Sequence, residues 1–130
     1  MADGDIYLPQ LTNDILTTGA SPTALLSVTA ASGTHQHVLW QVMAVAPAAI
    51  DLTYCVWTFT TMHVQGTSGT YLTFTESGYS TVKAGGAGGA TISITSADGS
   101  HYVVATGVAS RNIRWAARAQ VLYLVEATSY

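Results

Sequence analysis

From residue 23 onward the chain consists of runs rich in Val, Thr, Ile, Tyr and Trp, separated by short groups of small residues with Gly or Pro. These residue types favour β-strands, and the small groups favour turns. No stretch shows the period of a helix. The pattern therefore predicts an all-β chain, with strands at 24–29, 35–45, 50–63, 71–75, 90–95, 102–106 and 112–125.

The last predicted strand alternates most clearly. Its odd positions, from Ile113 to Tyr123, are apolar throughout, which indicates a face turned to the core. Its even positions begin with Arg114 and Arg118 and become apolar at Leu122 and Leu124. We expect a second sheet, an arm or another subunit to cover that end. Such long strands favour an antiparallel β-sandwich, jelly-roll-like in type.

Two turn signals stand out. Asp98-Gly99 lies between two alternating runs and predicts a tight β-hairpin. The glycine-rich segment 83–89 is typical of a mobile loop tip and has no phosphate-binding pattern.

Residues 1–22 lack regular periodicity and contain Pro9, Asn13, Gly19 and Pro22, which predicts an extended N-terminal arm that packs on a neighbour. Residues 23–130 form the predicted β-sandwich domain. A chain of 130 residues has the usual size of one domain, and we read it as a complete short chain that starts at Met1.

Charged residues make up only 8% of the chain, whereas a typical soluble domain has about 25%. A surface so poor in charge must consist of small polar residues or be buried against other copies, so we expect a homo-oligomer. No apolar run reaches the length of a membrane span, and no signal peptide is evident. The single cysteine, Cys55, lies in an apolar run and is predicted to be a buried thiol, which suits synthesis in a host cytoplasm.

The seven carboxylates are dispersed, and no nucleophile-elbow motif is present. We therefore expect no enzyme activity and no cofactor.

His35 and His37 stand at alternate positions of a predicted strand, so both imidazoles point to one face. Three such pairs around the axis of a trimer would supply six nitrogens to a metal ion, an arrangement that resembles the H-x-H pairs of phage fibre proteins. The alternative is a pair of half-exposed histidines without a metal. We expect His63 and His101 at the surface.

Arg111, Arg114 and Arg118 are the main group of basic residues. The pI of about 5.6 argues against nucleic-acid binding, and we expect these arginines to make contacts between subunits or strands. All three Trp residues lie in strand runs and are predicted to fill the core. Tyr79, in the loop-like segment ESGYS, and Tyr71 are the candidate contacts for a glycan.

The segment ATGVASRNIRWAARA, residues 105–119, resembles the closing segment of tailed-bacteriophage virion proteins, in which a similar Gly, Ile and Trp pattern completes a β-sandwich. The resemblance implies a structural protein of the virion, commonly trimeric. The absence of a fibre shaft favours a capsid decoration or cement protein, bound to the major capsid protein on the capsid surface. The alternatives are a tail or fibre component, or a receptor-binding module for glycans.

Overall fold

The structure, a computed structural model, describes residues 10–46, 53–66, 71–82, 90–97 and 99–125. Within these ranges every regular element is a β-strand, as the sequence predicts. The strands are β1 (Gln10–Thr17), β2 (Pro22–Thr29), β3 (Thr34–Ala46), β4 (Thr53–Gln65), β5 (Tyr71–Val82), β6 (Thr91–Ala97), β7 (Ser100–Thr106) and β8 (Ile113–Val125).

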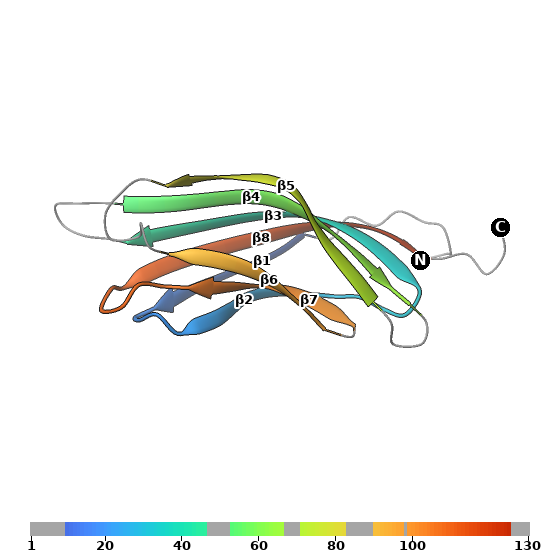
Figure 1. Cartoon of the computed structure of the whole chain (residues 1–130), viewed down its shortest axis with the longest axis horizontal. Helices are drawn as coiled ribbons and strands as arrows, with labels where there is room; N and C mark the ends of the chain where they lie inside the picture. Colours follow the sequence, from blue (N-terminus) through green and yellow to red (C-terminus); the bar gives the residue numbers. More distant parts are fainter. Residues whose placement is uncertain (1–9, 47–52, 67–70, 83–89, 98, 126–130) are drawn as a thin grey trace.

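The strands form two antiparallel sheets that pack as an elongated sandwich (Figure 1). The larger sheet has the order β1-β8-β3-β4-β5, and the smaller has the order β2-β7-β6. The predicted antiparallel β-sandwich is confirmed. The chain alternates between sheets over β1, β2 and β3 and again over β7 and β8, as in a jelly roll, but β3, β4 and β5 remain in one sheet.

The described part of the predicted arm is a strand. β1 pairs with β8 from Gln10↔Gln120 to Thr17↔Ile113, so the sheet begins well before residue 23. Residues 1–9 lie outside the described residues. The sequence pattern does not indicate this strand, because the polar residue Asn13 interrupts the apolar positions of its inner face. The Asn13 amide nitrogen, however, donates to the carbonyl oxygen of Leu25 in β2, and this bond joins the two sheets.

β2 contains a β-bulge between Ala24 and Leu26, where its register with β7 shifts. The bulge resets the alternation of the strand, so that Leu25 and Val28 both reach the core. At the end of β2, the buried Gln36 of β3 donates from Nε2 to the carbonyl oxygen of Thr29, at 2.9 Å. Side chains of the larger sheet thus bond two carbonyls of β2.

β5 is longer than predicted. The sequence places its end at residue 75, but the strand continues to Val82. Between the pairs Thr61↔Thr75 and Phe59↔Gly78, β5 carries one residue more than β4, which is a β-bulge. The residues ESG therefore look like a turn in the sequence and form an irregular piece of strand in the fold.

The predicted hairpin is confirmed. β6 and β7 pair up to Ala97↔Ser100, and Gly99 has a φ of 79°, the left-handed value that such a tight turn needs. Asp98 and the predicted loop at 83–89 lie outside the described residues.

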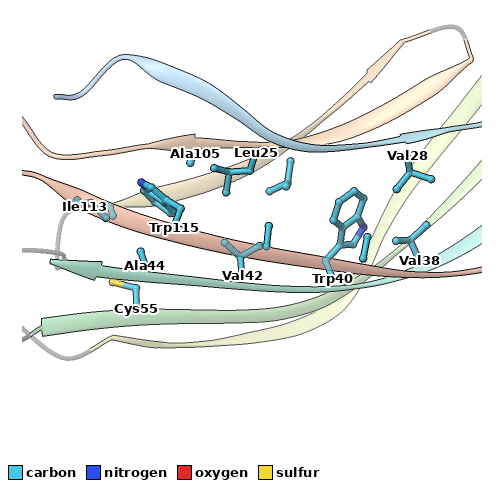
Figure 2. Close-up of a cluster of buried hydrophobic side chains, with 14 of the residues drawn as sticks. Leu25, Val28, Val38, Trp40, Val42, Ala44, Cys55, Ala105, Ile113 and Trp115 are labelled. Atoms are coloured by element: carbon cyan, nitrogen blue, oxygen red, sulfur yellow. The ribbon is translucent and has the colours of Figure 1, made fainter. Parts of the chain in front are cut away.

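The core runs the length of the sandwich, with Trp115 toward one end and Trp40 toward the other (Figure 2). Both rings are buried, and each indole N–H donates to a threonine hydroxyl, Thr61 for Trp40 and Thr17 for Trp115. Trp57 is half-buried and stacks on Trp115, with ring centroids 5.8 Å apart. The burial predicted for Cys55 is confirmed.

Candidate functional site

The outer face of the five-stranded sheet is the candidate functional site. Residues that pair across antiparallel strands point to the same side of a sheet. The buried even positions of β3 face the core, so its odd positions face outward. The register then places the even positions of β1, β4 and β8 on the same outer face.

Apolar side chains are concentrated on this face. Among the described residues, six large hydrophobic side chains are exposed, and five of them point outward from the five-stranded sheet. Their exposed fractions lie between 37% and 51%. These five are Leu16, Met43, Tyr54, Leu122 and Leu124. Exposed apolar groups gathered on one face, rather than scattered, mark a surface for interaction.

Rows of outward side chains cross the sheet, and two regions of the face differ most in character. Leu16, Met43 and Tyr54 lie outside both of them. The first, which we call the polar band, contains Thr12, Arg118, Gln41 and Thr58 on four adjacent strands. The second, which we call the apolar end, lies at the C-terminal end of β8 and contains Leu122, Leu124, His35, His37, Met62 and Val64. The apolar end has no formally charged residue.

A hollow of about 540 Å³ lies over the polar band and the adjacent row of residues. Thr12, Asp14, Gln41, Met43, Val56 and Arg118 are among its lining residues. The small side chain of Ala116 also lies in this row, opposite Asp14 and Met43.

The opposite surface of the sandwich has a different character. The exposed residues of β6 are Thr91, Ser93 and Thr95, and those at the end of β2 include Ser27 and Thr29. The outer face of the smaller sheet is thus rich in hydroxyl groups. The contrast singles out the outer face of the larger sheet as the surface suited to burial.

The three arginines do not form one cluster. Arg114 and Arg118 share the outer face of β8, as predicted, whereas Arg111 lies in the turn before that strand, where its backbone N–H donates to Val108. Arg118 donates to Gln41 Oε1 across the β3–β8 pair. Arg114 lies 3.9 Å from Asp14, but both side chains are mostly exposed, so this ion pair contributes little.

His35 and His37 are half-buried and lie side by side on the outer face, as the sequence predicts. Within the described ranges no group of three or more His, Cys, Asp and Glu side chains could hold a metal ion. A metal site at this pair would therefore need a ligand from outside these described residues, for example from another copy of the chain.

The two tyrosines proposed as glycan contacts both lie on β5, the edge strand of the larger sheet, near its beginning and in its second half. The loop predicted around Tyr79 is wrong, because Tyr79 lies within β5 and pairs with Thr58, an outward position. Tyr71 pairs with Gln65, an inward position, and its ring stacks on His63.

The surface positions predicted for His63 and His101 are also wrong. Both were expected at the surface, and both are fully buried. They pack against each other between the two sheets, with ring centroids 4.7 Å apart. The sequence signal for their burial is that each histidine stands at an alternate position shared with the inward residues of its strand, β4 or β7.

Across the described residues, no helix has the length and apolar character needed to cross a membrane. No family model matches the sequence, and no curated protein matches it.

The fold is similar to parts of two solved phage tailspike structures. The tailspike protein of Acinetobacter baumannii phage AM24 matches 95% of this chain with a TM-score of 0.54 at 8% sequence identity. The tailspike protein of Acinetobacter phage vB_ApiP_P1 matches 93% with a TM-score of 0.42 at 24% identity. The chain corresponds to 27% and 22% of those proteins' lengths. The sandwich thus resembles in fold one part of the phage AM24 tailspike.

Proposed function

We propose that this chain is a non-enzymatic assembly module of a phage tail spike or fibre, and that it associates with further copies through the outer face of the five-stranded sheet. The observation that carries the proposal is the concentration of five exposed large apolar side chains on that face. The similarity of the fold to part of a phage tailspike supports the proposed location in a phage tail.

The apolar end of this face is the region best suited to contact between copies. Leu122 and Leu124 are about half exposed and are flanked by uncharged side chains. Covering such side chains contributes about 25 cal/mol for each Å² of apolar surface removed from water. Because the chain is so poor in charge, association also removes little charged surface from water.

The first test is the mass of the purified protein in solution by light scattering. We expect a trimer of about 40 kDa, three times the 13.6 kDa of one chain. A double variant with Leu122→Asp and Leu124→Asp should be monomeric, because it introduces like charges into the contact. The matched control, Ser93→Asp with Thr95→Asp, places the same charges on the outer face of the smaller sheet and should leave the mass unchanged.

A wild-type protein that is monomeric at all concentrations tested would overturn self-association. If both double variants lose the oligomer, the contact is not specific to the proposed face. Circular dichroism of each variant shows whether the sandwich itself remains folded.

A second test addresses the location in the virion. Antibodies against the purified protein should label the tail in electron micrographs of the phage that encodes it. Labelling spread over the head shell would instead support a capsid decoration protein and overturn the tail assignment.

A further inference from the structure

Two buried histidines connect the sheets near the β6–β7 hairpin. His63 comes from β4 of the larger sheet and His101 from β7 of the smaller sheet, and neither has exposed surface. Their rings lie nearly parallel, at 5° to each other, with centroids 4.7 Å apart. At this end of the sandwich, the two sheets therefore meet partly through titratable rings.

Both ring nitrogens of His63 have hydrogen-bond partners. Its Nε2 lies 3.0 Å from Gln65 Oε1, and its Nδ1 lies 2.6 Å from Thr73 Oγ1. An amide oxygen only accepts hydrogen bonds, so Nε2 carries the hydrogen and Nδ1 accepts from the Thr73 hydroxyl.

His101 has one partner and one unpaired nitrogen. Its Nε2 lies 3.3 Å from Thr61 Oγ1, the oxygen that also accepts the indole N–H of Trp40 at 2.8 Å. Its Nδ1 is buried and has no hydrogen-bond partner. In a protonated ring both nitrogens are donors, so the cation would have a buried N–H without an acceptor.

The described residues that surround the two rings supply no compensating charge. His101 faces Trp40, Thr61 and His63, and its strand neighbours are Val28 and Ser96. His63 faces Tyr71, Thr73 and Gln65, with Gln36 as its neighbour in β3. Among these described residues the titratable groups are Tyr71 and the two histidines, and none is a carboxylate. Burial, and next the proximity of His63, lower the pKa of His101 from 6.5 to about 4.

The same network holds the hairpin in place. The amide of Gly99, in the turn between β6 and β7, donates to Gln65 Oε1 at 3.0 Å, the oxygen that His63 also uses. The carbonyl of Gly99 accepts from the amide of Ala30 at 2.7 Å. Gln65 thus bonds both the histidine stack and the turn.

We propose that the stacked pair of His63 and His101 is an acid-sensitive latch between the two sheets, which releases the β6–β7 hairpin from the end of β4 when His101 takes up a proton. The latch is a property of the single chain. It goes beyond the assembly function proposed above and does not depend on it.

The two buried tryptophans provide an internal comparison for the test. Both indole N–H groups donate to a threonine hydroxyl, but only Trp40 lies against His101. In a nuclear magnetic resonance titration of the wild-type protein from pH 8 to pH 3.5, we expect the indole signal of Trp40 to shift together with the titration of His101. The signal of Trp115 should stay in place. If both signals shift together, or if His101 titrates near 6.5, the latch is wrong.

Denaturant unfolding provides a second measurement. A pKa that falls from 6.5 to about 4 on folding means that the unfolded chain binds the proton more readily between these values. Stability is therefore complete above pH 6.5 and is lost as the pH falls toward 4. The corresponding decrease in the folding equilibrium constant is about 300-fold.

The variant His101→Phe retains an aromatic ring in the stack and removes the proton-binding nitrogen. It should lose most of this pH dependence, whereas the control Ser93→Ala, at an exposed position on the outer face of the smaller sheet, should keep it. A His101→Phe protein with the full wild-type pH dependence would overturn the latch. The titration of the wild-type protein decides the question even if this variant does not fold.

Discussion

The indole nitrogen of Trp115 lies 2.9 Å from the hydroxyl oxygen of Thr17, and this hydrogen bond fastens the start of β8 to the end of β1 inside the sandwich. Thr17 is itself almost fully buried. The acceptor is therefore shielded from water, and no solvent molecule readily replaces it.

The variant Thr17→Val keeps the shape of the side chain but leaves the Trp115 N–H without its acceptor. We expect a loss of about 1 to 3 kcal/mol in the free energy of unfolding, the usual cost of an unsatisfied buried donor. Urea unfolding followed by circular dichroism measures it. Thr95→Val, at an exposed position of β6, is the matched control and should change stability by less than about 0.5 kcal/mol.

Gly107 stands where a side chain does not fit. A Cβ atom there would lie 2.5 Å from the carbonyl oxygen of Gly19 and 2.8 Å from Thr17 Oγ1, which is already bonded to Trp115. We expect Gly107→Ala to cost at least about 1 to 3 kcal/mol, because backbone atoms must move.

Gly19→Ala is the matching control for this substitution. A Cβ atom at Gly19 meets no atom within 4 Å, so its thermal unfolding midpoint should stay near that of the wild type. Equal losses in the two variants would mean that the contact with Gly19 is not the cause.

Cys55 is predicted to be unreactive in the folded protein. It is fully buried, and burial raises the pKa of its thiol, so the reactive thiolate is disfavoured. At pH 8 an aromatic disulfide reagent should react on the order of 100-fold more slowly with the native protein than with the protein in denaturant, because local opening must come first. Equal rates would show that the strand region around Cys55 opens freely.

The outward pair His35 and His37 supplies two imidazoles from one chain. Two nitrogens without a third ligand hold a transition metal weakly, so we expect no stoichiometric metal after incubation with nickel or zinc and desalting. Elemental analysis of the desalted protein measures it. One ion for every three chains would instead establish the site at a three-fold axis.

Sequence patterns predicted the strands whose alternation is regular. β3 and β8 have unbroken inward positions, and the Asp-Gly turn fixes the β6–β7 hairpin. The two misassigned regions are both places where the alternation is disturbed. Asn13 interrupts the inner face of β1, and a bulge shifts the second half of β5. In each case the strand depends on a tertiary hydrogen bond or an irregular strand pair, which the alternation of apolar residues does not show.

The histidines show a different limit. His63 and His101 lie 38 positions apart, and no local pattern indicates that they stack. A buried polar side chain is recognisable only when its partners are known, and here Thr61, Thr73 and Gln65 come from neighbouring positions of two strands. By contrast, the location of His35 and His37 on one face follows directly from their spacing of two residues in a strand.

The side chains of Asn13 and Gln36 bond the carbonyls of Leu25 and Thr29 along β2, an outermost strand of the smaller sheet. An open strand edge invites another chain to add, and each addition exposes a new edge, so growth has no natural end. Carbonyls already occupied by side chains do not template such growth. If copies associate through the faces of their sheets, association can end at a fixed number of copies. The product is then a closed oligomer and not a filament.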